Sequence, residues 1–164
     1  MKISNLKDED FINYKKPSLF IGTCYCDWKC CDEGGFDRSI CQNHSLYNSK
    51  HHDLTNEQIY NRYINNPITS AIVIGGLEPI LQEDEVISLI EYFRIEKNCM
   101  DDFVIYTGYT EEELFPDKDN YGFYGRMKNI IFKFGRFIPD QEKHWDEVLG
   151  VYLISDNQYG KKVG

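Results

Sequence analysis

Residues 70–76 read Ser-Ala-Ile-Val-Ile-Gly-Gly, a continuous apolar run that is closed by two glycines. A run of this kind is typical of a strand that is buried on both faces, as in a parallel sheet. Four other short segments are rich in β-branched and aromatic residues and are also expected to be strands. They are residues 18–24, 103–107, 130–134 and 151–154.

Helical patterns lie between the predicted strands. Thr55-Asn-Glu-Gln58 has the spacing of a capping box and precedes apolar residues at helical intervals. The apolar stripe of a second helix is formed by Val86, Leu89, Ile90 and Phe93. Strands that alternate with helices indicate right-handed βαβ units.

The predicted elements are too few for a closed eight-stranded barrel. We therefore expect an α/β fold with a mostly parallel sheet, in the form of a partial, open βα barrel. The 164 residues fit a single domain, with a leader segment over 1–16 and a core over about 17–164. The leader is expected to be a loop or a short helix, as are residues 116–126 and 139–146.

Composition and charge exclude several classes of protein. Hydrophobic residues make up 41% of the chain, which excludes a disordered chain, and no apolar run reaches the roughly 18–20 residues of a membrane span. The polar N-terminus lacks the apolar core of a signal peptide, so we expect a cytoplasmic protein without a membrane partner. The net charge is −9 and there is no basic stripe, which makes nucleic acid a poor partner.

Five of the six cysteines lie within 18 residues, and only Cys99 stands apart. In a cytoplasmic chain such crowding indicates metal or redox chemistry rather than disulfides. The five are Cys24, Cys26, Cys30, Cys31 and Cys41, on a loop that follows the first predicted strand.

Three kinds of chemistry suit this loop. Cys26 and Cys30, with Cys41 and His44, have the spacing of a zinc site. The adjacent Cys30 and Cys31 could act as a redox pair. Three cysteines could instead hold an iron–sulfur cluster, which leaves one iron open to chelate a ligand that carries an amine and a carboxylate.

The end of the next predicted strand suits the third possibility. In an open parallel sheet, ligands bind at the carboxyl ends of the strands, where the cysteine loop and Gly75-Gly76 both fall. Glycines let the backbone approach a ligand closely. The Glu78 carboxylate can accept charge-assisted hydrogen bonds from an ammonium group.

Six motifs in chain order carry a family resemblance. They are Phe20-Ile-Gly-Thr23, Cys41-Gln-Asn-His-Ser45, Ile74-Gly-Gly-Leu-Glu-Pro79, Tyr106-Thr-Gly-Tyr109, Lys133-Phe-Gly-Arg-Phe137 and Ser155-Asp-Asn-Gln158. With these motifs the chain resembles the radical S-adenosylmethionine superfamily. Within it, the chain is most similar to the small activating proteins of anaerobic ribonucleoside-triphosphate reductase. The resemblance spans roughly residues 18–163.

The sequence departs from this family at two places. The family has Cys-x3-Cys-x2-Cys, whereas here Glu33 stands at the third position and the pattern becomes Cys26-x3-Cys30-x10-Cys41. The additional Cys24 and Cys31 leave the choice of ligands open. Leu77 separates Gly-Gly from Glu-Pro.

The resemblance implies a [4Fe-4S] cluster held by Cys26, Cys30 and Cys41, with S-adenosylmethionine as the second cofactor. Gly75, Gly76 and Glu78 would receive the amino group of S-adenosylmethionine, while Thr107, Ser155 and Asn157 would line the rest of its site. Reductive cleavage would give a 5′-deoxyadenosyl radical. This radical would take a hydrogen atom from a glycine of a glycyl radical enzyme, the large subunit of an anaerobic ribonucleotide reductase.

An electron donor such as flavodoxin or ferredoxin is also implied. Two alternatives stay open at this point. One is a radical S-adenosylmethionine enzyme that acts on a small molecule or a peptide, and the other is a zinc-stabilised binding module without catalysis.

Overall fold

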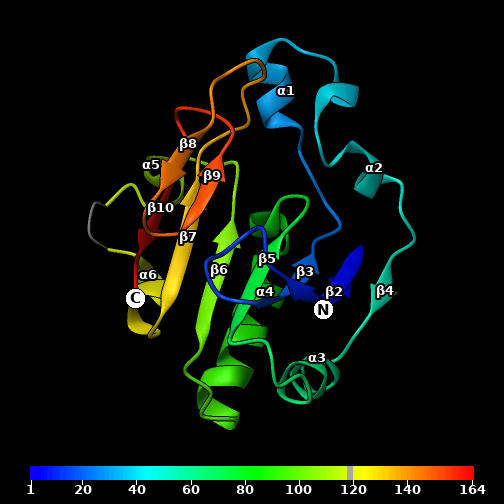
Figure 1. The fold of residues 1–164 in the computed structure, drawn as a ribbon, viewed down its shortest axis with the longest axis vertical. Coiled ribbons are helices and arrows are strands. Elements are labelled where there is room, and N and C mark those ends of the chain that lie inside the picture. Colours follow the sequence, from blue (N-terminus) through cyan, green and yellow to red (C-terminus); the bar gives the residue numbers. More distant parts are fainter. Residues whose placement is uncertain (118–119) are drawn as a thin grey trace.

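A six-stranded mixed sheet forms the centre of the protein, as seen in a computed structural model that describes residues 1–117 and 120–164 (Figure 1). Its order is β10-β7-β6-β5-β3-β2. The four inner strands run parallel, and they are β3 (Ser18–Gly22), β5 (Ala71–Gly75), β6 (Asp102–Tyr106) and β7 (Ile130–Phe134). The edge strands β2 (Asn5–Asp10) and β10 (Tyr159–Lys162) are antiparallel to their neighbours.

The register of the parallel strands brings their carboxyl ends to one edge of the sheet. Gly22 pairs with Gly75 across β3 and β5, and Tyr106 pairs with Lys133 across β6 and β7. The predicted strands 18–24, 70–76, 103–107 and 130–134 are therefore confirmed within one or two residues. Apolar runs specify these strands because both of their faces are buried.

Helices cover one face of the sheet. The capping box of Thr55 and Gln58 begins α3 (Asn56–Ile64). The predicted stripe lies on α4 (Glu83–Glu91), which follows the 3-10 turn η2 (Pro79–Gln82) and continues as the π-helix η3 (Tyr92–Glu96). Buried residues of these helices form the larger hydrophobic core with the sheet. The short helices α5 (Glu111–Leu114) and α6 (Gly122–Arg126) complete this layer beside β7.

A chain segment and a hairpin cover the other face. Residues 11–17 cross in front of the sheet in Figure 1, and the Tyr14 hydroxyl donates to Asp102 at 2.9 Å. The hairpin of β8 (His144–Asp146) and β9 (Val151–Leu153) lies against the same face. The amide of Lys15 donates to the carbonyl of Leu149 at 2.8 Å, so the segment and the hairpin are joined.

Three sequence-based expectations are corrected by this arrangement. Residues 151–154 give strand β9, but it pairs with β8 outside the main sheet, whose edge position is taken by β10. Residues 139–146, expected as a loop or short helix, contain β8. Residues 1–16 contribute β1 (Lys2–Ile3), which pairs with β4 (His52–Asp53), as well as β2. Strand β2 was not predicted because its sequence is mostly charged and polar, and an edge strand buries little apolar surface.

Within predicted segment 116–126, residues 122–126 form α6, whereas residues 118–119 lie outside the described part of the chain. Among the described helices, none has the length and apolar character that crossing a membrane would require.

Candidate metal centre

A cavity of about 480 Å³ lies at the carboxyl ends of the parallel strands. Its walls come from the cysteine loop, the strand ends, segment 11–13 and β9. This volume is within the range of roughly 300–1,000 Å³ that is usual for small-molecule sites. The predicted rim of the sheet therefore borders a cavity whose volume suits a small molecule.

Three of the five crowded cysteines line this cavity, namely Cys26, Cys30 and Cys41. Cys24 is only 1% exposed and lies near Lys2 and Glu85, outside the cavity wall. Cys31 is 2% exposed, and its Sγ atom lies 3.8 Å from that of Cys30. The fold thus separates the cysteines that face the cavity from two that lie inside the protein, although a role as ligands stays a prediction for all of them.

The cysteine loop is shaped by a left-handed turn at Trp28. With φ of 60°, Trp28 precedes α1 (Lys29–Gly34), and its amide donates to Cys26 Sγ at 3.3 Å. The Trp28 ring contacts the rings of His44 and Tyr47 at centroid distances of 5.8 and 5.1 Å. These two residues belong to α2 (His44–Tyr47), which follows Cys41. The indole ring therefore connects the Cys26–Cys30 segment to the segment that carries Cys41.

Burial disfavours the thiolate form of two of the cysteines that face the cavity. Burial raises the pKa of Cys26 to about 11. Burial also raises the pKa of Cys41, although the backbone amides of Asn43 and His44 partly oppose this shift. A metal or cluster binds thiolates, so loading this site must release protons.

Glu78 is a buried carboxylate in the wall of the same cavity. It accepts hydrogen bonds from the Thr107 hydroxyl at 2.7 Å, the Gly108 amide at 2.8 Å and the Ile80 amide at 3.1 Å. Burial raises its pKa, and these three donors oppose the shift. The Ile80 contact makes Glu78 the N-cap of η2, so it has a structural role as well as a place in the cavity.

The other predicted cofactor residues divide into two groups. Gly76 and Thr107 line the cavity, and Gly76 needs to be glycine because its φ is +85°. Gly75 and Asn157 are not brought to the cavity wall. Ser155 is buried and not on the wall, since its hydroxyl accepts from the Ile138 amide and donates to the Ile138 carbonyl.

Lys133 is a site residue to which the sequence reasoning assigned no role. It is 7% exposed and lines the cavity from β7, where its Nζ atom donates to the Gly135 carbonyl at 2.7 Å. Burial lowers its pKa to about 7, and attraction to Glu78 and Cys30 opposes this shift. A lysine inside the apolar run Ile130–Phe134 was the signal that could have found it, because a strand buried on both faces rarely holds a charge.

An ion-pair network ties the cysteine loop to the rest of the cavity rim. Arg136 donates to Glu113 at 2.7 Å, to Glu33 of α1 at 3.1 Å and to the Gly108 carbonyl at 3.3 Å. Lys29 at the start of α1 also bonds to Glu113, at 2.5 Å. The Arg136 guanidinium holds the pKa of Glu113 well below its usual range. The network therefore links α1 to the ends of β6 and β7.

We expect Arg136→Gln to increase hydrogen exchange of the amides of residues 27–34 by roughly ten- to a hundred-fold. Losing hydrogen bonds to a charged group costs about 1.5–3 kcal/mol, and every 1.4 kcal/mol is about a factor of ten. The matched control is Arg62→Gln, because Arg62 pairs with the exposed Asp8 away from the loop. Equal exchange of residues 27–34 in both variants would show that the network does not hold the loop.

The chemistry of the donor set fits an iron–sulfur cluster, because three cysteines line one cavity and cysteine thiolates are the usual ligands of such clusters. Within residues 1–117 and 120–164, no three His, Cys, Asp or Glu side chains form a group that could hold a metal ion.

Comparison with known proteins agrees with this donor set. A protein-family model described as a 4Fe-4S single cluster domain matches residues 17–147, which include all five crowded cysteines. No curated protein and no solved structure matches the chain. Since the matched region covers well over half of the sequence, the chain belongs to the 4Fe-4S single cluster domain family and is an iron–sulfur protein.

Proposed function

We propose that this protein is a radical S-adenosylmethionine activating enzyme that generates a glycyl radical on a partner enzyme. Cys26, Cys30 and Cys41 would hold the [4Fe-4S] cluster, and S-adenosylmethionine would occupy the rest of the cavity. The observation that carries the proposal is that these three cysteines share one cavity with a buried carboxylate and a buried ammonium. The partial βα barrel that the family resemblance implies is part of the proposal.

The charges in the cavity complement the amino-acid end of S-adenosylmethionine. That end carries one ammonium and one carboxylate, and each needs a buried partner of opposite charge. Glu78 can accept from the ammonium, and Lys133 can donate to the carboxylate. Both side chains line the cavity, so one ligand can reach both.

The protein holds Glu78 in place before any ligand arrives. A carboxylate has about four acceptor positions, and Thr107, Gly108 and Ile80 use three of them. The fourth acceptor position of the Glu78 carboxylate is available to a ligand in the cavity. Because Thr107 and Gly108 come directly after β6, the sheet itself fixes the direction of this carboxylate.

The remaining walls of the cavity keep water away from the bound cofactor. Phe20, Leu77, Tyr106, Phe137 and Ile154 contribute apolar surface. A [4Fe-4S] cluster held by Cys26, Cys30 and Cys41 would supply the electron for reductive cleavage of S-adenosylmethionine, and thereby a 5′-deoxyadenosyl radical that can take a hydrogen atom from a substrate. An apolar wall protects such a reactive group from side reactions.

The test of this function starts with anaerobic purification and reconstitution with iron and sulfide. We expect about four irons per chain, as in one [4Fe-4S] cluster, and formation of 5′-deoxyadenosine after addition of dithionite and S-adenosylmethionine. Stoichiometric zinc without iron would contradict the proposal and support a zinc-stabilised module.

The partner is tested separately. The reduced protein is incubated with S-adenosylmethionine and the large subunit of an anaerobic ribonucleotide reductase from the same genome, and the glycyl radical is measured by electron paramagnetic resonance. Formation of 5′-deoxyadenosine without any glycyl radical would favour a different substrate.

A further inference from the structure

Strand β9 has one edge without a strand partner, and this strand lines the cavity. In the described part of the chain β9 pairs only with β8, in a two-stranded sheet. Residues 151–154 all contribute to the cavity wall. A strand edge offers backbone amides and carbonyls, which are the groups that bind an extended peptide by strand addition.

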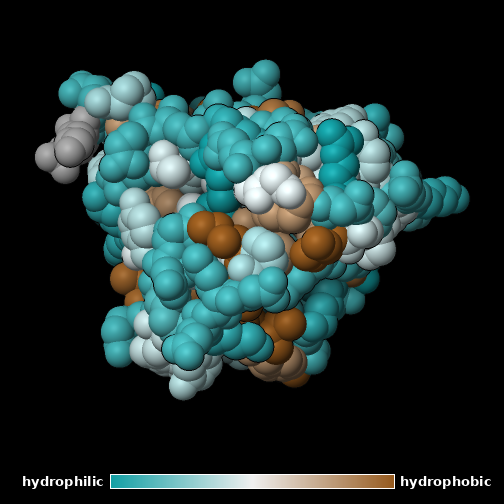
Figure 2. Space-filling view, turned by 90° about the horizontal axis from the view of Figure 1, so that it is seen from above, coloured by the Kyte–Doolittle hydropathy of each residue, from teal (hydrophilic) through white to brown (hydrophobic). Residues whose placement is uncertain are grey.

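Exposed aromatic and aliphatic side chains surround the mouth of the cavity beside this edge. Tyr152 is 65% exposed, lines the cavity and contacts the ring of Trp145, which is 48% exposed, at a centroid distance of 5.3 Å. Ile12, which also lines the cavity, is exposed as well. Seen from above, the molecule has a few hydrophobic side chains in the middle of a largely hydrophilic surface (Figure 2). Trp and Tyr are the residue types that most often dominate binding energy at interfaces.

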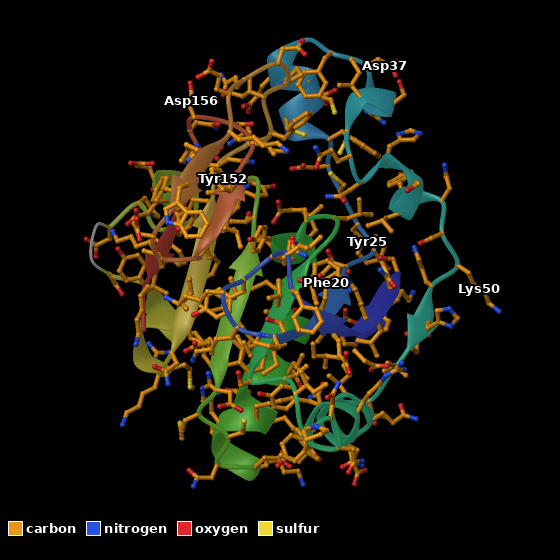
Figure 3. The ribbon with its side chains drawn as sticks, in the orientation of Figure 1. Phe20, Tyr25, Asp37, Lys50, Tyr152 and Asp156 are labelled. Atoms are coloured by element: carbon orange, nitrogen blue, oxygen red, sulfur yellow. The ribbon has the colours of Figure 1, made fainter. Side chains whose placement is uncertain are left out.

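The segments that flank β9 in the chain are rich in acidic residues. Residues 137–158 contain five acidic residues and one basic residue. Of the five, Asp140, Glu142, Glu147 and Asp156 are exposed, and none of these has a salt-bridge partner in the described structure. Asp37 lies at the upper end of the molecule, on the opposite side from Asp156 (Figure 3). Exposed carboxylates in the segments that flank β9 favour a cationic partner.

We infer that the mouth of the cavity is the docking surface for an extended polypeptide segment of the partner that carries lysine or arginine. The segment adds to the free edge of β9, its apolar side chains contact Tyr152, Trp145 and Ile12, and its basic side chains meet the acidic rim. Strand addition places one backbone position of the segment at the cavity, where the cysteines and Glu78 lie. This inference rests on the proposed function for its choice of a polypeptide substrate.

The test uses the full chain and a library of heptapeptides that have glycine in the centre and all residues at the other six positions. We expect the peptides that bind to be enriched in Lys and Arg and depleted in Asp, Glu and Pro. N-methylation of alternate amides in the best peptide should weaken binding at least ten-fold, because it removes backbone donors and leaves the side chains unchanged. The inference would be overturned if acidic peptides were selected or if no peptide bound. It would also be overturned if N-methylation left the affinity of the best peptide unchanged.

Charge-reversal variants locate the peptide on the protein. The double variant Glu142→Lys/Asp156→Lys should bind the best peptide at least ten-fold more weakly. The affinity that remains should depend less on the salt concentration. The matched control is Glu91→Lys, an exposed acidic residue at the end of α4, on the other face of the sheet. Equal losses in both variants would contradict this location.

Peptide binding is measured on the chain without S-adenosylmethionine, so its outcome is independent of catalysis. A protein that forms 5′-deoxyadenosine but binds no cationic peptide refutes the docking surface and leaves the proposed function intact. A protein that binds the peptide but holds no cluster refutes the proposed function alone.

Discussion

Replacing Cys30 by alanine will abolish binding of the iron–sulfur cluster. Cys30 lines the same cavity as Cys26 and Cys41, and the three are the proposed ligands. Two thiolates alone do not hold a [4Fe-4S] cluster, which is bound by cysteine thiolates at each protein-ligated iron. The measurement is the iron and sulfide content of the reconstituted protein, together with its visible absorption. Full iron content in Cys30→Ala would refute the assignment of this ligand.

The remaining cysteines provide matched controls for this result. Cys99→Ala should keep the cluster, because the Cys99 thiol is directed to Asp101 at 3.7 Å, away from the cavity. Cys24→Ala and Cys31→Ala should also keep it, since neither residue lines the cavity. If either of these variants lost its iron while Cys26→Ala retained it, the ligand set proposed for this protein would be wrong.

Glu78→Ala should keep the cluster but weaken the binding of S-adenosylmethionine by roughly ten- to a hundred-fold. The physical reason is the loss of a charge-assisted hydrogen bond, which costs about 1.5–3 kcal/mol, at about 1.4 kcal/mol for each factor of ten. The affinity is measured by anaerobic titration of the reconstituted variant, and cleavage by the 5′-deoxyadenosine assay. Both should fall, whereas the iron content should not.

A second variant separates ligand binding from the structural role of Glu78. Alanine also removes the cap of η2, and losing an N-cap costs about 0.5–2 kcal/mol of stability. Glu78→Gln keeps an oxygen that can accept from Ile80 and Thr107 but loses the negative charge. We therefore expect Glu78→Gln to keep the cap of η2, although the Gly108 amide loses its acceptor, and to bind S-adenosylmethionine as weakly as Glu78→Ala does.

Glu85→Gln is the matched control, because Glu85 contacts Gln82 and Lys2 outside the cavity. It should bind the cofactor as the unmodified protein does. Unchanged affinity in both Glu78 variants, with only the unfolding midpoint lowered, would leave Glu78 as a helix cap and nothing more.

The local sequence was sufficient to predict the inner part of the fold. β3, β5, β6 and β7 are buried on both faces, which imposes the continuous apolar runs from which they were predicted. The capping box before α3 was readable for a similar reason, since its hydrogen bonds join residues three apart in the chain. Local patterns missed five strands, and few residues of these strands are buried: they are β1, β2, β4, β8 and β10.

The sequence showed which residue types form the site, but it did not show which of the five crowded cysteines line the cavity. Crowded cysteines pointed to metal chemistry, and the order of the strands placed Gly76, Glu78 and Thr107 at one edge of the sheet. Spacing could not separate Cys26, Cys30 and Cys41 from Cys24 and Cys31. That separation depends on the turn at Trp28 and on its ring contacts with α2, which join residues far apart in the chain. The place of Lys133 on the cavity wall was also decided by the tertiary structure, because the packing of loops over the sheet decides which side chains of a buried strand face an open space.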